Sequence, residues 1–566
     1  MAQPNKPTGK SANTKVRDKK PATYASLKKE PETLFSGIDK FFNKNSKFLV
    51  IFILGLGVLF SLLLFQARMD TGGDDSGYIT RAYDFIHKGV FPSYQGPLYP
   101  LVLSIFVSVL GIKIVFLKFL SIIFNFIALL FLYKAFKGRI PSFVLYSVLL
   151  LAAVNTYILN FASETYNESF FMALQYIFFY YFFKLQDSLK PVGQGQTTDT
   201  WRVWLPVGVL LLLMTLTRNI AISWTMACIT GLMIYFGYRK QFKHLIYLGV
   251  GALVAIIYEK TQGSSQGDLL TLIDPYNASK GKRHIGDFIS DFFQNSNLYI
   301  SKRLYQILGF KSDIDMDTSP WLTFFTIIIL LFAIYRIIKS KNRYLLIASL
   351  YVLVMAGATF FALQTRWDQP RMVMIYVPLL LMIFLYGLYD LFKKSPFVLQ
   401  MMVFLIVPIL FIYEFKSTIQ KANENLPIIK KNMNGDIYAG YTPDWVNYLK
   451  LSQWCESLPK DSLVACRKGP MSRVYANGRM FINISTVDSI RSTNADSAIA
   501  FLKKTQTRYL LIASLRSNPL VADGNILNGV HRLIAPIYRK YPQKVKFIKQ
   551  EGATGAEEAQ LFEIQY

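Results

Sequence analysis

One unbroken apolar run decides the fold of this chain: Phe48-Leu-Val-Ile-Phe-Ile-Leu-Gly-Leu-Gly-Val-Leu-Phe-Ser-Leu-Leu-Leu-Phe65. Its length approaches the roughly 20 residues that an α-helix needs to cross the hydrocarbon core of a bilayer. Basic residues precede the run and no small-residue cleavage site follows it, which indicates a retained anchor rather than a cleaved signal peptide. The chain is therefore expected to begin on the cytoplasmic side and to cross a membrane here.

The composition of the whole chain extends this prediction. Of its 566 residues, 52% are hydrophobic, which is typical of a polytopic α-helical membrane protein. The net charge of +27 comes mostly from Lys and Arg between the apolar runs. Such a pattern marks cytoplasmic loops and argues against a nucleic-acid partner. Residues 1–47 are polar, basic and rich in Pro, Ser and Thr, which predicts a disordered cytoplasmic tail.

We predict about 11 transmembrane helices with the N-terminus inside. The candidate spans are 48–67, 114–133, 142–159, 166–184, 203–217, 219–237, 244–258, 320–338, 345–363, 372–392 and 397–415. This topology puts the basic loops 134–139, 238–244, 335–343 and 392–394 in the cytoplasm and the loops 68–113 and 259–319 outside. Residues 98–110 are apolar but short for a span, so they are expected to form an interfacial or re-entrant helix on the outer face.

Residues 420–566 are predicted to form an extracytoplasmic α/β domain, which we expect to be a lid or docking module. Short β-prone runs are expected at 462–466, 479–483, 508–513, 545–548 and 561–564, with helical stretches such as 495–504 and 524–541 between them. A helix should begin after Thr442, which is an N-cap residue followed by Pro443. Cys455 and Cys466 either form a disulfide, if the domain lies in an oxidising compartment, or remain free.

On this topology, polar side chains from several loops share the outer face. The first loop carries three carboxylates immediately after the first span, in Met69-Asp-Thr-Gly-Gly-Asp-Asp-Ser-Gly-Tyr78. Later loops add Glu164, Glu168, Arg218, Lys282, Arg283, Arg366, Asp368 and Arg371. Carboxylates can accept a proton or hold a metal, and arginines bind phosphate through paired donors. Solvated acids and snorkelling cations are the alternative interpretation of individual residues.

Four motifs carry a family resemblance. Asp74-Asp75-Ser-Gly-Tyr78, followed by Gly96-Pro-Leu-Tyr-Pro100, is similar to the acidic motif that follows the first span of the GT-C membrane glycosyltransferases. Ser163-Glu-Thr165, Leu216-Thr-Arg218 and Pro370-Arg-Met-Val-Met-Ile-Tyr-Val-Pro378 resemble later motifs of that superfamily. The resemblance covers most of residues 48–415 and is to the branch with lipid A aminoarabinose transferases and protein O-mannosyltransferases. Asp75 replaces a more frequent Glu, and Met372 stands where an aromatic residue is common.

The resemblance implies a glycosyltransferase in the bacterial cytoplasmic membrane, with its site and terminal domain on the periplasmic side. The donor would be a sugar on a polyprenyl phosphate, and the acceptor a hydroxyl of a glycan, lipid or protein. Asp74 is predicted to be the general base and Asp75 to support it, while Asp70 is expected to be a bystander. Glu164 would orient the acceptor. Arg218 and Arg371 would stabilise the phosphate, with Arg366, Lys282, Arg283, Tyr78 and Tyr99 as further donor-binding residues.

A metal and other functions remain open at this stage. No cofactor is required, although Asp74, Asp75 and Glu164 suit Mg²⁺ or Mn²⁺. An oligosaccharide ligase or polymerase with a diphosphate-linked donor would keep the same fold. A lipid or sugar transporter or flippase is the alternative from a different class, but transporters collect polar residues near the midplane, and here they gather at one face.

Overall fold

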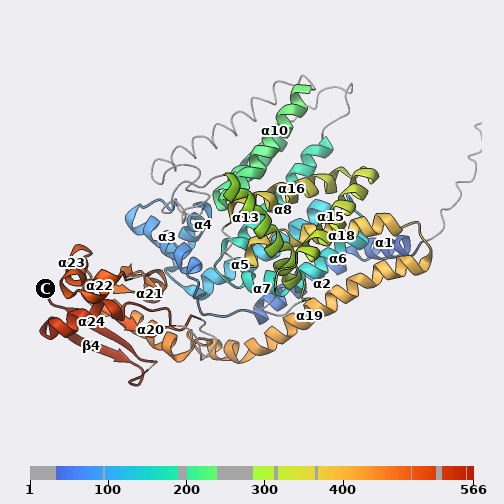
Figure 1. Cartoon of the computed structure of the whole chain (residues 1–566). Helices are drawn as coiled ribbons and strands as arrows, with labels where there is room; N and C mark the ends of the chain where they lie inside the picture. Colours follow the sequence, from blue (N-terminus) through green and yellow to red (C-terminus); the bar gives the residue numbers. More distant parts are fainter. Residues whose placement is uncertain are drawn as a thin grey trace, which may run out of the picture.

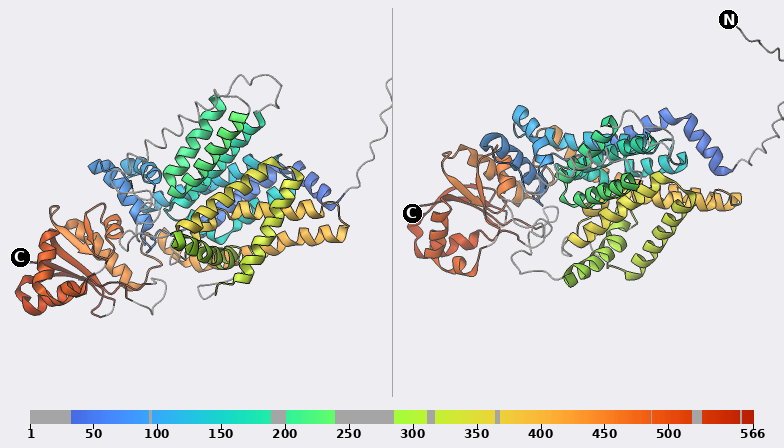
Figure 2. Two further views of the ribbon diagram at one scale, coloured as in Figure 1. Left: turned by 45° about the horizontal axis from the view of Figure 1, so that its top comes forward. Right: turned by 90° about the horizontal axis from the view of Figure 1, so that it is seen from above.

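The computed structural model describes residues 33–93, 96–188, 201–238, 285–310, 317–363, 368–485, 487–517, 526–555 and 557–566. Its helices form an elongated bundle with the C-terminal domain at one end and helix α1 at the opposite end (Figures 1 and 2). The predicted span 244–258 and the site residues Lys282, Arg283 and Arg366 lie outside the described residues.

Five described helices are long and apolar enough to cross a membrane: α2 (Ser46–Leu63), α5 (Ile114–Phe136), α15 (Pro320–Ser340), α16 (Arg343–Ala362) and α19 (Phe397–Met433). A bent pair, α6 (Ser142–Val154) and α7 (Thr156–Ala162), gives a sixth candidate. The helices α8 (Asn167–Ser188), α9 (Trp201–Thr217), α10 (Ile222–Tyr238) and α18 (Val377–Phe392) occupy four further predicted spans. The membrane-protein class follows from these helices, whereas eleven crossings remain a prediction.

The 58° bend between α6 and α7 has a clear local cause at Asn155. Its side-chain oxygen accepts hydrogen bonds from the backbone N–H groups of Tyr157 and Ile158, so it caps α7 and ends α6. Its amide nitrogen donates to the Ile307 carbonyl and to the Glu414 carboxylate, both at 2.7 Å. The bend is thus fixed by buried polar partners, and it directs the chain toward the segment 163–168.

Two short helices lie beside the terminal domain. Helix α3 (Asp74–Lys88) begins after Gly73, whose φ of 95° favours glycine, and α4 (Leu98–Leu110) covers the short apolar stretch for which an interfacial or re-entrant helix is predicted. The ring of Tyr78 packs edge-on against that of Tyr99, with ring centroids 5.2 Å apart. Gly96 is required just before α4, because a Cβ there would lie 2.3 Å from the Thr217 carbonyl oxygen.

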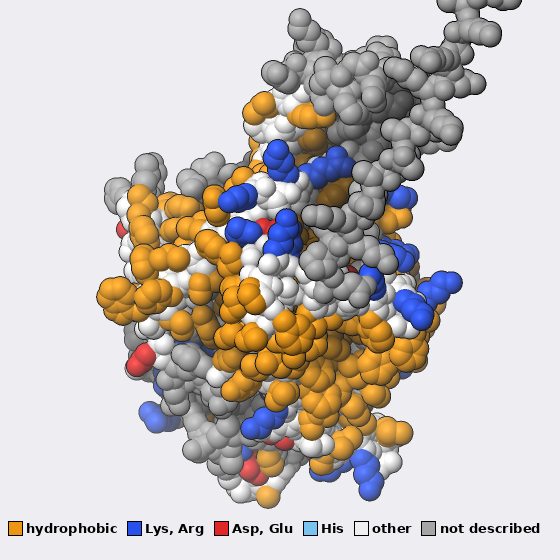
Figure 3. Space-filling view, turned by 90° about the vertical axis from the view of Figure 1, so that its right-hand side faces the viewer, with side chains coloured by type: hydrophobic (Ala, Val, Ile, Leu, Met, Phe, Trp, Pro, Cys, Tyr) orange, Lys and Arg blue, Asp and Glu red, His pale blue; other side chains and the backbone are white. Residues whose placement is uncertain are grey.

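The opposite end of the bundle carries the basic loops. Arg139 pairs with Asp187 at 2.7 Å, and its carbonyl accepts a hydrogen bond from Asn342. Lys and Arg side chains are scattered over this end within a broad apolar surface (Figure 3). The basic loops 134–139, 335–343 and 392–394 therefore lie together, at the end away from the loop 68–75. Residues 239–244 of the fourth predicted loop lie outside the described residues.

Helix α1 (Leu34–Lys44) also lies at this end and corrects the predicted tail, because disorder was expected up to residue 47. The helix forms because Thr33 caps it and Phe35 is fully buried. Asp39 on the same helix accepts hydrogen bonds from the Phe143 backbone N–H at 2.7 Å and the Tyr389 hydroxyl at 3.1 Å. An amphipathic helix of this kind gains stability from docking on the bundle rather than from its composition.

The C-terminal domain contains a five-stranded mixed sheet of order β2-β1-β3-β5-β4. Strands β1 (Leu463–Cys466), β2 (Phe481–Asn483) and β3 (Thr507–Ala513) are parallel, whereas β5 (Ala559–Ile564) pairs antiparallel with β3 and β4 (Val545–Glu551). Each strand lies where the sequence predicts one. The flanking helices are α20 (Pro443–Trp454), α21 (Gly469–Tyr475), α22 (Ser489–Thr493), α23 (Ala495–Lys504) and α24 (His531–Lys540).

Two details of this region differ from expectation or settle an open alternative. Helix α19 does not end near residue 415 but continues to Met433, so it runs along the side of the bundle and leads into the terminal domain (Figure 1). Polar residues of its second half pack inward; Asn425, for example, donates to the carbonyls of Leu63 and Phe65 at 2.9 Å. Cys455 and Cys466 are both buried and free.

Candidate active site

The N-terminus of α3 presents two adjacent acids in opposite ways. Asp75 is fully buried, and its carboxylate accepts hydrogen bonds from the backbone N–H groups of Asp70 and Ser76. The Asp74 side chain is 34% exposed and accepts a hydrogen bond from Arg371. Asp75 therefore folds the loop, whereas Asp74 is the acid that faces the open side of the site. The positive end of the helix dipole favours both negative charges.

Two arginines meet one buried glutamate beside Asp74. The Glu168 Oε1 atom lies 3.4 Å from Nη1 of Arg218 and 3.9 Å from Nη1 of Arg371. Glu168 stands in the first turn of α8, and Asn167 beside it donates to the Thr217 carbonyl at 3.1 Å, which joins the start of α8 to the end of α9. The predicted pair Arg218 and Arg371 is thus brought together, although the two residues come from distant spans.

Glu168 is a site residue to which the sequence analysis assigned no role, although it placed this acid on the outer face with a solvated acid as the alternative interpretation. It is 1% exposed, and its Oε2 atom has no hydrogen-bond partner among the described residues. A buried carboxylate that lies between two arginines is not a solvated acid. The sequence feature that could have identified Glu168 is its position at the start of an apolar run, four residues after Glu164.

The segment that carries Arg371 is held on both sides. The Arg371 Nε donates to the Gln369 side chain at 2.7 Å, and the guanidinium lies 4.8 Å from the centre of the Tyr166 ring. Asp368, in the same segment, pairs with Lys302 at 2.8 Å and with Arg303. Lys302 and Arg303 belong to a π-helical turn, Tyr299–Arg303, a geometry that is frequent at functional sites. The neighbouring carboxylates Glu168 and Asp74 raise the pKa of Arg371 despite its burial, so it stays cationic.

Asp70 is not a bystander, which corrects the expectation for this residue. Its carboxylate accepts a hydrogen bond from the Tyr166 hydroxyl and another from the Gly72 N–H at 3.2 Å. Its backbone N–H is one of the two that Asp75 holds. Asp70 therefore ties the first outer loop to the segment before α8, a role that depends on tertiary contacts and has no local pattern.

Glu164 lies in the same acidic cluster but faces a cation that the sequence analysis missed. Its Oε2 atom is 2.9 Å from Nζ of Lys118, which is fully buried in the second turn of α5 and also donates to the Arg68 carbonyl. Burial raises the pKa of Glu164, and the Lys118 ammonium opposes the rise. Burial together with the charges of Asp70 and Glu164 raises the pKa of Asp75 well above its ordinary value.

Tyr78 and Tyr99 are placed against each other rather than toward solvent, since Tyr78 is 4% exposed and Tyr99 fully buried. The Arg81 guanidinium stacks on Tyr78, 4.7 Å from the ring centre. Burial raises the pKa of Tyr78 to about 12, so its hydroxyl stays protonated. The two rings therefore join α3, which carries Tyr78, to α4, which carries Tyr99. Direct contact of either tyrosine with a donor stays a prediction.

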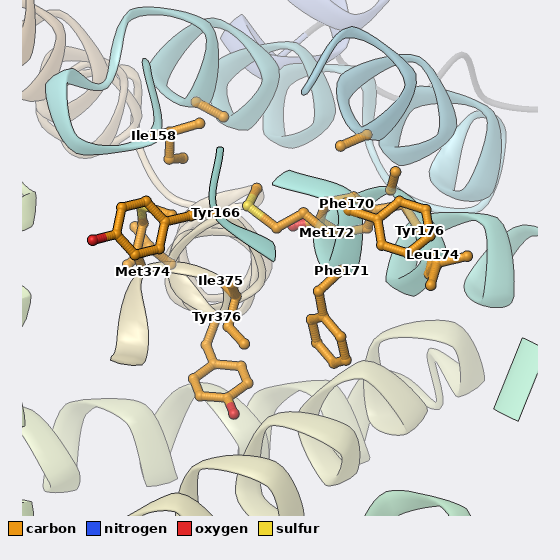
Figure 4. Close-up of a cluster of buried hydrophobic side chains, with 14 of the residues drawn as sticks. Ile158, Tyr166, Phe170, Phe171, Met172, Leu174, Tyr176, Met374, Ile375 and Tyr376 are labelled. Carbon is orange, nitrogen blue, oxygen red and sulfur yellow. The ribbon is translucent and has the colours of Figure 1, made fainter. Parts of the chain in front are cut away.

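The segment that follows Arg371 contributes to an apolar groove. Its volume is about 690 Å³, and its walls come from α13 (Ile285–Leu298), α15 and α16, with Phe292, Phe324 and Leu353 among them. Val373 and Tyr376, two and five residues after Arg371, complete the lining. Tyr376 belongs to the buried cluster that also holds Phe171 and Met172 of α8, so the arginine segment and the start of α8 share one packed core (Figure 4).

The acids do not form a ready metal site. Asp74 is paired with Arg371, Asp75 holds two backbone N–H groups, and Glu164 is paired with Lys118. Among the described residues, no group of three His, Cys, Asp or Glu side chains stands close enough together to hold a metal ion. A divalent cation needs several free oxygen ligands, so the residues present do not fit one in this arrangement.

The terminal domain directly contacts the loop 68–75, which carries the three aspartates. The Lys468 ammonium donates to the Thr71 carbonyl at 2.6 Å, and the Tyr441 hydroxyl donates to the Met69 carbonyl. Arg473 makes two hydrogen bonds of 2.6 Å to the Asp84 carboxylate on α3. A bidentate pair of this kind fixes orientation as well as distance. The domain therefore braces the acidic loop on the side away from the bundle (Figure 1).

Comparison with known proteins finds similarity only at the level of structure: no protein-family model matches the chain, and no curated protein sequence matches it. The Archaeoglobus fulgidus oligosaccharyltransferase, solved with a tethered acceptor peptide, is 12% identical with a TM-score of 0.49 over 84% of this chain and 70% of that chain. ArnT from Cupriavidus metallidurans in the apo state is 10% identical with a TM-score of 0.48 over 91% and 98%. ArnT bound to undecaprenyl phosphate is 9% identical with a TM-score of 0.49 over 91% and 97%.

Identities and TM-scores in this range assign no activity. The chemistry proposed for this chain therefore rests on its own site residues.

Proposed function

We propose that this chain is a membrane glycosyltransferase that moves a sugar from a polyprenyl-phosphate-linked donor to an acceptor hydroxyl at the outer face of the cytoplasmic membrane. The observation that carries this proposal is the juxtaposition of Asp74, Arg371, Glu168 and Arg218. The segment that follows Arg371 also contributes Val373 and Tyr376 to an apolar groove.

The arginine pair supports a phosphate site. Both guanidiniums lie within 4 Å of the same Glu168 oxygen, so two cations stand side by side here. Guanidinium donors match the geometry of phosphate oxygens and remain charged at all physiological pH values. Their place at the site lets them stabilise negative charge as it develops on a leaving phosphate.

The groove supports a lipid-linked rather than a soluble donor. It is lined almost entirely by apolar side chains and includes Val373, two residues after Arg371. A polyprenyl chain in the groove would hold its phosphate at Arg371 and Arg218, and the binding energy of the chain would position the anomeric carbon. A sugar nucleotide has no tail to fill such a groove.

Asp74 is suited to the role of general base. It is the exposed acid of the pair, and it accepts a hydrogen bond from Arg371. A donor phosphate competes for Arg371 and thereby leaves the Asp74 carboxylate free to accept a proton. The base then becomes available only when the donor is in place, which limits loss of the donor to water.

The proposed reaction is a single displacement. The acceptor O–H proton passes to Asp74, and the acceptor oxygen forms a bond to the anomeric carbon. The bond from that carbon to the phosphate oxygen breaks, and its electron pair remains on the polyprenyl phosphate beside Arg371 and Arg218. Attack opposite the leaving group inverts the anomeric configuration. In this scheme Asp75, Asp70 and Glu164 hold the loop and do not touch the reacting atoms.

The donor class can be tested with the full chain in lipid nanodiscs. A panel of undecaprenyl-linked sugars, each as the monophosphate and the diphosphate, is incubated with a detergent extract of cell-envelope glycolipids as acceptor. The lipid product is quantified: undecaprenyl phosphate from the monophosphate donors and undecaprenyl diphosphate from the diphosphate donors. Release from a monophosphate donor with an inverted product is expected. Turnover of diphosphate donors alone would instead identify an oligosaccharide ligase.

A further inference from the structure

Lys118 is an isolated ammonium group in an apolar helix. It is the only basic residue in the first five turns of α5, its side chain is fully buried, and its Nζ atom lies 2.9 Å from Glu164 Oε2. The same Nζ donates to the Arg68 carbonyl, at the start of the acidic loop. Lysine is costly to bury unless it is paired and hydrogen-bonded, so its position calls for a function.

Acids and cations meet around Lys118: the acids are Asp70, Asp75 and Glu164, and Arg68 and Lys468 are the other neighbouring cations. Of these three cations, Lys118 is the one whose side chain is fully buried. The charges of Asp70 and Glu164 both act on Asp75, and the Lys118 ammonium opposes them. Three carboxylates from two loops thus share one buried neighbourhood with this ammonium. Like charges at this spacing repel strongly in a poorly solvated interior, and a cation is needed to hold them together.

The carboxylate oxygens near Lys118 are already committed. Glu164 faces the ammonium, and both oxygens of Asp75 accept backbone N–H groups. The remaining acid, Asp70, is engaged by Tyr166. A divalent ion could join these acids only by displacing the ammonium, since the two cations would compete for the same oxygens.

We propose that the Lys118 ammonium is the resident cation of this acidic cluster and stands where a divalent metal would otherwise join Glu164 to the first outer loop. The inference rests on the proposed function and adds that transfer proceeds without a divalent metal. Lys118 is a positioning residue: through the Arg68 carbonyl and Glu164 it fixes the loop 68–75, and hence the place of Asp74 opposite Arg371.

The test measures metal binding directly, with Mn²⁺ as the probe. The full chain in nanodiscs is washed with EDTA, titrated with MnCl₂, and the free Mn²⁺ is followed by electron paramagnetic resonance. Three proteins are compared: the wild type, Lys118→Met, and Lys113→Met as the control. Lys113 is the exposed lysine that precedes the same helix, so its loss changes net charge equally and leaves the cluster intact.

Wild type and Lys113→Met are expected to bind no stoichiometric Mn²⁺, whereas Lys118→Met should bind one Mn²⁺ in the vacated position. Stoichiometric Mn²⁺ on the wild type overturns the proposal, and so does a folded Lys118→Met variant that binds none. If Lys118→Met fails to fold, the wild-type titration still decides, and Lys118→Met combined with Glu164→Gln should restore folding because both charges leave together. Lys118→Arg should keep the wild-type behaviour.

The binding readout is independent of the donor. A chain that binds no Mn²⁺ but transfers no sugar from a polyprenyl monophosphate would contradict the proposed function and leave the cation assignment standing. Transfer that stops with EDTA and returns with Mn²⁺ would contradict the cation assignment and leave the proposed function standing.

Discussion

The guanidinium of Arg371 donates a hydrogen bond to the carboxylate of Asp74, although the two residues stand 297 positions apart in the chain. Asp74 opens α3 after the first span, and Arg371 opens α17 (Arg371–Met374), just before α18. Neither residue has the other as a local neighbour, so the pair exists only because the bundle brings two loops to one end. This pair joins the proposed general base, Asp74, to Arg371, which is proposed to bind the phosphate of the donor.

Replacement of Arg371 by lysine should separate charge from geometry. Lysine keeps a cation but loses the paired donors that suit both phosphate and the Asp74 carboxylate. We expect turnover to fall by about 10²–10³-fold, the cost of losing one preorganised donor at a developing charge. The measurement is the rate of undecaprenyl phosphate release at saturating donor. Arg343→Lys, at the far end of the bundle where Arg343 pairs with Asp187, is the matched control and should leave the rate unchanged.

Neutralising Glu168 should affect folding before chemistry. Glu168→Gln removes the carboxylate that both Arg218 and Arg371 share and leaves two largely buried guanidiniums facing each other. Breaking a buried charge pair costs about 3–5 kcal/mol, and the partial exposure of these arginines places the expected loss near the lower limit. Thermal unfolding in nanodiscs measures the effect, and undecaprenyl phosphate should restore stability by binding the freed arginines. An unchanged melting temperature would show that the glutamate is not their structural partner.

Asp75 predicts a pH dependence of stability with a definite sign. Because burial and neighbouring acids raise its folded-state pKa above the unfolded value, the folded chain holds a proton that the unfolded chain releases. The resulting stabilisation is complete below the unfolded pKa of about 4 and is lost as pH rises through the folded-state value.

We therefore expect the contribution of Asp75 to stability to fall as pH rises from about 4 toward neutrality, and it is measured as the difference in melting temperature between wild type and Asp75→Asn at each pH. Asp75→Asn cannot ionise, so it should lack this contribution. Asp461→Asn changes an exposed acid of the terminal domain and is the control. A variant profile parallel to that of the wild type would mean that another group carries the pH dependence.

The brace between the terminal domain and α3 can be tested by a charge swap. Arg473 is largely buried against Asp84, so Arg473→Asp or Asp84→Arg alone should cost about 3 kcal/mol and expose the domain to proteolysis. The double variant should recover much of this loss, and transfer activity should follow the same order because the domain also holds the Thr71 carbonyl through Lys468. The equivalent swap of the exposed pair Lys540 and Asp496 should leave the melting temperature essentially unchanged. Full activity in the single variants would show that the brace does not support the site.

Local sequence patterns predicted most of the secondary structure. Alternating β-prone runs located all five strands of the terminal domain, and the short apolar stretch located α4 with the bounds Leu98–Leu110. Helix α1 was not predicted, because its stability comes from the packing of Phe35 and Asp39 against the bundle, and the composition of residues 1–47 does not indicate that packing. The continuation of α19 past residue 415 was not predicted, because the second half of the helix is polar and has the composition of a surface segment.

The site shows the same division. Asp74, Arg218 and Arg371 were predicted from motifs, and the structure brings them together around Glu168. Lys118 was hidden inside an apolar run, although a single charge in such a run is itself a signal. The role of Asp70 depends on a hydroxyl nearly a hundred residues away, Tyr166, and no periodicity or spacing could have assigned it.

The most direct measurement for the central claim compares the wild type with Asp74→Asn in the same nanodisc preparation. Binding of undecaprenyl phosphate and transfer from the undecaprenyl-phosphate-linked sugar are measured side by side, with Asp187→Asn at the opposite end of the bundle as the control. Loss of the general base should lower turnover by about 10²–10⁴-fold. Binding of undecaprenyl phosphate should stay equal or become tighter, because Arg371 no longer has to release a carboxylate. Wild-type turnover in Asp74→Asn, or parallel loss of binding and turnover, would contradict the account.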